Sequence, residues 1–311
     1  MRQFDNNFTK INHVMSTVFK KLRSTRNYTL EDAADEGISI SQLSSFEQGK
    51  TRLSAPALFT ALQNINVNTY EFQYACNKRL EQKDILLFNT EVTNAYMDDS
   101  VPKLKILLKS VQDEIKLHPN KKKFKFDKIR VEATLYSPDS DYEPAEEDIA
   151  FTKNYLVNLS SWGNEDIRLF SQCLPFFDVN VIINLTGKMT DLVKVSPQLH
   201  YTQHVFIQTL LNIVDRFIEL RAFDKARHYI NYLEDYKIHE YYMYEKLTLI
   251  YNRAKLNYLE DGDDESLNTM KHCKEVMDFC GCLKTGLLME NEMEESLEER
   301  GVKGVEKHGS Q

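Results

Sequence analysis

The 311-residue sequence has few of the residues that interrupt helices, with only 10 glycines and 7 prolines. It also lacks long runs of β-branched residues, while leucine, isoleucine, tyrosine and phenylalanine are abundant. This composition favours an all-α protein with an ample hydrophobic core. A chain of this length is long enough for about two or three domains.

Long apolar segments are missing as well. No apolar run approaches the roughly 18 residues of a membrane span, and the N-terminal segment MRQFDNNFTKIN has no apolar stretch of the signal-peptide type. The five cysteines are spread over the chain, which argues against a disulfide framework and for a reducing compartment. We therefore expect a cytoplasmic protein that does not enter a membrane.

Motifs of catalysis and metal binding are absent too. There is no Gly-rich phosphate loop, no H-E-x-x-H and no G-x-S-x-G, and the eight histidines are scattered. His272, Cys273, Cys280 and Cys282 lie close together in sequence, but their spacing matches no common zinc module, so we interpret them as small residues of a helical repeat. We predict no cofactor and no enzyme; an enzyme stays open as a third class, because missing motifs are weak evidence.

Charge is distributed unevenly. Residues 1–80 contain ten Lys/Arg against seven Asp/Glu, whereas residues 81–311 contain 29 against 40. A basic N-terminal part on an acidic remainder fits a protein that contacts phosphate through its first domain.

The segment 28–50 predicts two short helices joined by a turn. Thr29 can cap the first helix and Asp32 has the capping-box spacing. Gly37 supplies the turn, where a positive φ costs little. Ser39 then caps a second helix, Ile40 to Gln48, which Gly49 ends.

The second of these helices has two different faces. Leu43, Phe46 and Glu47 point one way, while the other face is small and polar. A helix this short cannot be stable alone in water, so packing must hold it. A small polar outer face is typical of a helix presented to a DNA major groove.

The order Ser39-x-Ser41-Gln42-Leu43-Ser44-x-Phe46-Glu47-x-Gly49 resembles the helix-turn-helix of phage-repressor-like regulators. It is most similar to the Rgg/MutR/GadR group of Gram-positive transcription regulators, over about residues 22–72. The resemblance implies a five-helix DNA-binding domain followed by an all-helical domain that, in several members, binds a short re-imported peptide.

Roles at the DNA follow from the same resemblance. Ile40, Ser41 and Ser45 hold positions that meet base edges, and Glu47 is expected to be structural, buried near a basic residue or backbone N–H groups. Neutral residues at 40, 45 and 48, where relatives often have Lys or Arg, imply fewer guanine contacts and more reliance on DNA shape or dimer geometry. The positions that usually hold backbone phosphate are Ser39, Gln42, Lys50 and Arg52.

Periodicity predicts further helices in the N-terminal domain, residues 1–80. They cover Val14 to Arg26, a helix capped by Ser54 with Pro56 in its first turn, and Thr69 to Leu80. From residue 81 to 289 the pattern predicts successive helix pairs with a repeat of roughly 35 to 40 residues, a right-handed tetratricopeptide-like array for regulation and dimerisation. Residues 290–311 are charged, and we expect partial disorder there.

The predicted helix with the clearest pattern of apolar and polar residues in the array is 199–221. Phe206, Leu210, Ile213 and Phe217 form a core stripe, and a polar stripe with Gln208 and Asn212 runs along another face. Amide side chains there could hold the backbone of an extended peptide, although a solvated face is equally compatible with the pattern. Candidate peptide-binding residues are Arg168, Asn184, Gln208, Asn212 and Tyr229.

Residues 121–125 contain four lysines. Contact with DNA or a membrane is one interpretation, and a solvated helix start is the simpler one.

Taken together, these features predict a homodimeric transcription regulator that binds an inverted-repeat operator in double-stranded DNA and senses an effector, by resemblance a short hydrophobic signalling peptide. The alternative is a helical-repeat protein-interaction module, an anti-activator or scaffold, that does not bind DNA.

Overall fold

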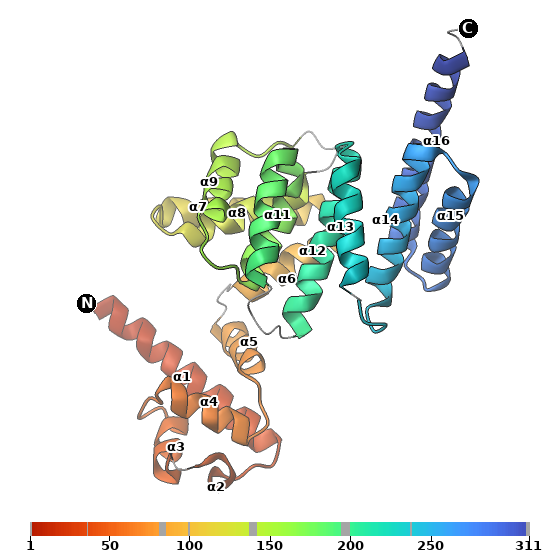
Figure 1. The fold of residues 1–311 in the computed structure, drawn as a ribbon. Coiled ribbons are helices and arrows are strands. Elements are labelled where there is room, and N and C mark those ends of the chain that lie inside the picture. Colours follow the sequence, from red (N-terminus) through yellow and green to blue (C-terminus); the bar gives the residue numbers. More distant parts are fainter. Residues whose placement is uncertain are drawn as a thin grey trace. The chain divides into compact units, whose positions relative to one another are not determined.

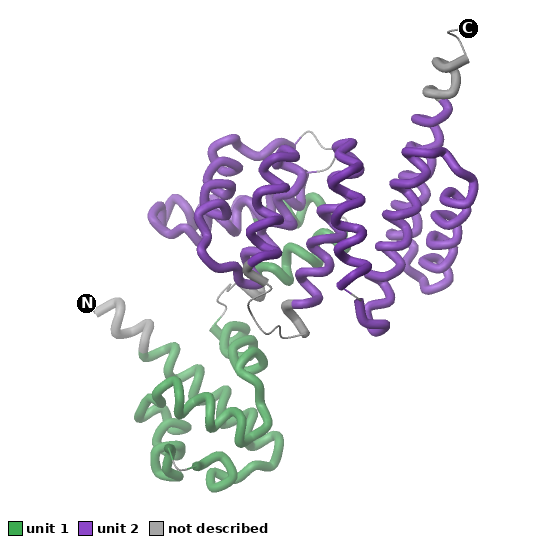
Figure 2. Tube along the Cα trace, viewed as in Figure 1, with its two compact units in different colours: residues 1–107 green, residues 108–311 purple. Residues whose placement is uncertain are grey.

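The computed structural model describes residues 2–35, 37–80, 85–98, 100–136, 142–193, 200–236 and 238–308. Within these ranges the regular structure is entirely helical, apart from one isolated bridge between Asp35 and Ile38, and the all-α prediction is confirmed (Figure 1). The chain forms two compact units, residues 1–107 and residues 108–311, whose boundary lies inside α7 (Figure 2).

The first unit begins with the helix-turn-helix domain. Its fifth helix ends at Leu80, and α6 follows after residues 81–84, which lie outside the described ranges. The helices are α1 (Arg2–Thr25), α2 (Leu30–Ala33), α3 (Ile40–Glu47), α4 (Ala55–Asn64), α5 (Thr69–Leu80), α6 (Ile85–Met97) and α7 (Val101–Leu117), which continues into the second unit.

The predicted caps of the helix-turn-helix are present. Thr29 forms a capping box with Asp32, and Ser39 forms one with Gln42. Gly49 has φ +73°, the left-handed conformation that ends a helix cheaply when the residue is glycine. The bridge between Asp35 and Ile38 closes the turn, with the Ile38 N–H donating to the Asp35 carbonyl at 2.8 Å.

The core of this domain lies behind α3. Leu43 and Phe46 are fully buried against α1, where the Phe19 and Phe46 rings lie 5.8 Å apart. Burying side chains of this size stabilises each by roughly 1.5–3 kcal/mol, and this supports a helix too short to form alone.

The second unit is an array of helices that follow the predicted pairs closely. The bounds differ from the sequence interpretation by a few residues, and residues 174–176 form a 3₁₀ turn rather than the end of an α-helix. The elements are α8 (Lys122–Leu135), α9 (Glu146–Val157), α10 (Asn164–Cys173), η1 (Leu174–Phe176), α11 (Val179–Val193), α12 (His200–Glu219), α13 (Phe223–Asp235), α14 (Met243–Asp261), α15 (Asp264–Phe279) and α16 (Leu283–His308).

The even-numbered helices of this unit form a continuous row. Helix α8 packs on α10, α10 on α12, α12 on α14 and α14 on α16, while α9, α13 and α15 pack between successive members. The succession α12, α13, α14 can be followed in Figure 1. Stacked helix pairs produce this pattern, in which a helix of the row such as α12 contacts both the next helix in sequence and the one after it.

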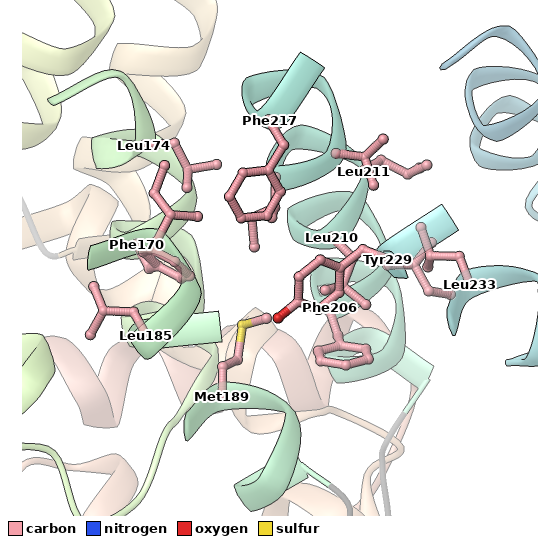
Figure 3. Packing of buried hydrophobic residues seen from close by; sticks show 14 of the residues in the cluster. Phe170, Leu174, Leu185, Met189, Phe206, Leu210, Leu211, Phe217, Tyr229 and Leu233 are labelled. Atoms are coloured by element: carbon pink, nitrogen blue, oxygen red, sulfur yellow. The ribbon is translucent and has the colours of Figure 1, made fainter. Parts of the chain in front are cut away.

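Helix α12 is the centre of the hydrophobic core. The expected core stripe Phe206, Leu210, Ile213 and Phe217 is fully buried. Figure 3 shows Phe206 and Phe217 of α12 together with Tyr229 of α13, beside side chains of α10 and α11. This stripe connects α12 with its neighbours α10, α11 and α13.

The last helix, α16, covers Leu283 to His308. The partial disorder expected from residue 290 stays a prediction. Met293 and Ser296 are buried in α16, because their spacing keeps one face against α14. In the described part of the chain, no helix combines the length and apolar character needed to cross a bilayer.

Candidate DNA-binding and ligand-binding surfaces

The outer face of α3 is exposed as its two-faced sequence predicts. Ile40 is 47% exposed, Ser41 and Gln42 are exposed, and Ser45 is half-buried. The opposite face carries the buried Leu43 and Phe46. The candidate base-reading residues therefore lie on the surface of the helix and contribute little to the core.

Two of the candidate phosphate-binding residues also hold the helix start. The Ser39 hydroxyl accepts the Gln42 N–H at 3.2 Å, and Gln42 Oε1 accepts the Ser39 N–H at 2.9 Å. The amide NH₂ of Gln42 takes no part in this capping box. Lys50 and Arg52 are exposed in the segment after Gly49, where Asn12 of α1 donates to the Thr51 carbonyl at 3.3 Å.

Behind α3, Glu47 forms an ion pair with Arg23 of α1. Arg23 Nε and Nη2 donate to the two carboxylate oxygens at 2.6 and 2.8 Å, and Nη1 donates to the Tyr28 carbonyl at 2.6 Å. The side chains are only 12% and 5% exposed, and the hydrogen bond to Glu47 raises the pKa of Arg23. Glu47 is thus a structural residue paired with a basic residue of its own domain, as expected.

The candidate peptide-binding residues are distributed over four helices. Asn184 of α11 is exposed, Arg168 of α10 is half-buried, and Gln208 and Asn212 lie on α12. Tyr229 differs from the others, because it is 7% exposed and its ring stacks on Phe217 at 5.9 Å. A side chain enclosed in this way shapes the core and does not present a binding face.

The polar stripe of α12 bonds to neighbouring helices of the row. Asn212 donates to the Ser171 hydroxyl of α10 at 3.0 Å. On the other side, His204 Nε2 and Gln208 Nε2 lie 2.6 and 3.2 Å from the same carboxylate oxygen of Glu245, a residue only 4% exposed in α14. The stripe therefore fixes the spacing between α10, α12 and α14.

A second polar contact ties three helices of the row together. Lys255 of α14 reaches Asp215 of α12 and Glu292 of α16, each at 3.1 Å. Burial alone would lower the pKa of Lys255, but the two carboxylates outweigh it and the pKa is raised. Burial also raises the pKa of Glu292, against the effect of Lys255. The sequence interpretation missed this lysine; its only signal is a charge at the helical spacing of the buried Tyr251 and Tyr258.

The cysteine-rich segment provides no metal-binding group. Among the described residues, no three His, Cys, Asp or Glu side chains are placed to hold an ion together. Cys273 is buried, Cys280 exposed and Cys282 half-buried, all as free thiols, and burial raises the pKa of Cys273.

A family model matches the second part of the chain. The model of the HTH-type transcriptional regulator Rgg, C-terminal domain, matches residues 106–291, more than half of the chain.

Among solved structures, the chain is similar to the Streptococcus dysgalactiae SHP pheromone receptor Rgg2, with 22% identity, a TM-score of 0.72 and coverage of 90% of this chain and 99% of that one. It is also similar to a putative transcriptional regulator from Listeria monocytogenes EGD-e, with 16% identity, a TM-score of 0.75 and coverage of 93% and 99%. For PrgX in complex with cCF10, the values are 14%, 0.67, 90% and 98%. At these identities the structural likeness shows the fold.

The lysine contact yields a pH-dependent prediction. In Lys255→Met, Glu292 loses its cation, and an uncompensated buried charge costs about 3 kcal/mol of unfolding free energy near neutral pH. Because burial holds the folded-state pKa of Glu292 above its ordinary 4.5, the loss should be small below pH 4.5 and grow as the pH rises. Urea unfolding followed by Trp162 fluorescence measures it.

The matched control is Lys255→Met with Glu292→Gln, in which Asp215 is the one carboxylate left from this contact, so the loss should depend much less on pH. A loss in Lys255→Met that is the same at pH 4 and pH 8 would contradict this account of the contact.

Proposed function

The chain belongs to the Rgg family of helix-turn-helix transcriptional regulators, and from this premise we propose that it binds operator DNA through α3 and senses a short peptide through the helical array. The family consists of regulators, not enzymes. The observation that carries the DNA-binding proposal is the exposed, small and polar face of α3, held from behind by a buried core and an ion pair.

Hydrogen bonds from α3 to the DNA would be few. Ser41 and Ser45 can each donate to or accept from a base edge, and Ile40 offers an apolar surface for a thymine methyl group. Without Arg on this face, bidentate guanine contacts from α3 are missing. Sequence preference would then depend more on groove shape and on the spacing between two bound copies.

Lys50 and the NH₂ of Gln42 would bind phosphate and set the position of α3 in the groove. The basic excess of residues 1–80 supports this role, because phosphate contacts supply most of the sequence-independent affinity. Because the proposed partner is DNA, we also propose that the protein is cytoplasmic.

We further propose a homodimer that binds an inverted repeat. An apolar surface at the start of α16 supports it: Leu283 and Leu287 are 67% and 58% exposed, and Phe279 just before them is 92% exposed. Side chains this apolar at the end of a helical array usually face a partner. In an antiparallel pair of α16 helices, Lys284 would lie near the partner's run of acids, which begins at Glu290.

The proposed effector is a short hydrophobic peptide. Rgg2 is described as an SHP pheromone receptor and PrgX as forming a complex with cCF10. In this chain, the row α10–α12–α14 offers Arg168 for a carboxylate and the amides of Gln208 and Asn212 for a peptide backbone, with Asn184 on α11. Tyr229 would support the site from the core beneath.

A peptide at this row would compete with existing polar contacts. Gln208 now bonds to Glu245 and Asn212 to Ser171, so engaging either amide would release a bond between neighbouring helices. Such an exchange gives the ligand a different affinity for two arrangements of the row, which is the requirement for coupling to DNA binding.

The DNA-binding proposal predicts that Ser41→Ala and Ser45→Ala each weaken operator binding by about fivefold, since a lost hydrogen bond costs about 1 kcal/mol. Lys50→Ala should weaken binding to all DNA sequences alike and reduce the slope of log K against log salt by about one unit for each bound protomer. Mobility shifts of the full chain on its own promoter region measure both effects.

Ser24→Ala, at the exposed end of α1, is the control and should leave binding unchanged. Full specific affinity in both Ser41→Ala and Ser45→Ala would refute the groove assignment. Wild-type protein that does not prefer promoter DNA over random DNA would instead favour the protein-interaction module.

The effector proposal predicts reciprocal coupling. Synthetic peptides translated from short reading frames beside the gene are titrated calorimetrically into the full chain, with and without operator DNA. One of them should bind, its affinity should change with DNA by the same factor as DNA affinity changes with peptide, and Asn184→Ala should weaken it. Binding that DNA leaves unaltered would contradict the sensor mechanism.

A further inference from the structure

The turn between α7 and α8 is strongly basic although it belongs to an acidic part of the chain. Residues 115–126 contain five lysines and one histidine and no acid, whereas residues 81–311 as a whole contain 29 Lys/Arg against 40 Asp/Glu. We call this surface the basic corner, and it consists of Lys116, His118, Lys121, Lys122, Lys123 and Lys125.

The position of these lysines is unfavourable for the helix that carries them. Lys121 is the N-cap of α8 and makes no side-chain cap, and Lys122 and Lys123 follow in the first turn. A cation there opposes the helix dipole by about 0.3–1 kcal/mol. The neighbouring α9 and α10 start with acids instead, as helix stability favours. Stability of α8 therefore does not account for the lysines.

Aromatic rings support part of the basic corner. Lys123 Nζ lies 5.6 Å from the centre of the Phe124 ring, and Lys125 Nζ lies 5.0 Å from that of Phe151. On Phe124 the His118 ring stacks at 5.9 Å and 19°. These contacts hold the ammonium groups at the surface and reduce the conformational entropy that binding would remove.

Nearby acids neutralise the basic corner only at its edge. Asp113 pairs with Lys116 at 2.9 Å, and Glu114 lies 3.9 Å from His118. The next acid along α8, Asp127, is 3% exposed; burial raises its pKa, and the charge of Lys123 acts in the opposite direction. Lys121 and Lys122 are exposed beyond these acids, so the surface presents a concentrated positive charge.

We propose that the basic corner is a second DNA contact, one that binds the phosphate backbone of the duplex flanking the operator without reading its sequence. The proposal rests on the proposed DNA-binding function. Lysine ammonium groups together with the N–H groups at the start of α8 suit phosphate oxygens. A protein-docking surface would instead centre on exposed aromatic or arginine anchors, and here Phe124 lies half-buried beneath the lysines.

The test compares two duplexes, the operator alone and the operator with about 20 base pairs of random flank on each side. In Lys121→Gln/Lys122→Gln/Lys123→Gln, the proposed dimer loses three lysines from each protomer. The slope of log K against log salt on the long duplex should therefore fall by up to about 5, at about 0.9 per phosphate contact. Affinity for the long duplex should fall at least tenfold. Affinity for the operator alone should not change.

The control is Lys225→Gln/Lys246→Gln/Lys271→Gln, which changes net charge equally at exposed positions of α13, α14 and α15. It should leave binding to both duplexes unchanged. The variant of the basic corner should fold, because it removes cations from a helix N-terminus; thermal unfolding checks this.

Equal effects of both triple variants would overturn the proposal in favour of a general charge effect. Unchanged binding to the long duplex would overturn it in favour of another anionic partner, such as an acidic protein. Failure of the proposed sequence-specific binding has a different result: the wild type would show no preference for the operator over random DNA. A loss of long-duplex binding confined to the basic-corner variant would still support the contact between the basic corner and DNA.

Discussion

The ion pair between Arg23 and Glu47 fixes α3 to α1, and the proposed function depends on it. An eight-residue helix is not stable in isolation. Leu43 and Phe46 bury its inner face, and the bidentate pair sets its orientation with two short hydrogen bonds. Removing one partner of such a buried pair would leave an uncompensated charge at a cost of about 3–5 kcal/mol. Because the inner face supplies the stability, the outer face is available for contacts with DNA.

The helical array uses the same arrangement on a larger scale. Its apolar core around α12 supplies stability, while buried or half-buried polar groups link one helix of the row to the next. Glu245 receives two donors from α12, and Lys255 connects α12 to α16. Such contacts are specific in geometry, so the row has few ways to rearrange. A ligand that exchanges its own polar groups for these would therefore favour a distinct arrangement of helices.

Local sequence signals predicted most of the fold. Contacts within four residues define several helix ends, so these ends could be predicted from the sequence; they are the caps at Thr29, Ser39 and Ser54 and the glycine at 49. The partner of Glu47 was expected only as a basic residue. Contacts between residues about 40 apart, such as Gln208 with Glu245 and Asp215 with Lys255, depend on how repeats stack, and no local pattern encodes that. For the same reason the sequence does not decide between a groove-lining and a helix-packing role for Tyr229, which is enclosed against Phe217 in the fold.

In the proposed complex, α3 lies in the major groove at each half of a symmetric operator. Methylation interference tests it directly, because dimethyl sulfate modifies guanine N7 in the major groove and adenine N3 in the minor groove. With α3 in the groove at both half-sites, guanine N7 methylation should interfere in two clusters about ten base pairs apart, one turn of the duplex. Interference confined to adenine N3, or a single unpaired cluster, would contradict it.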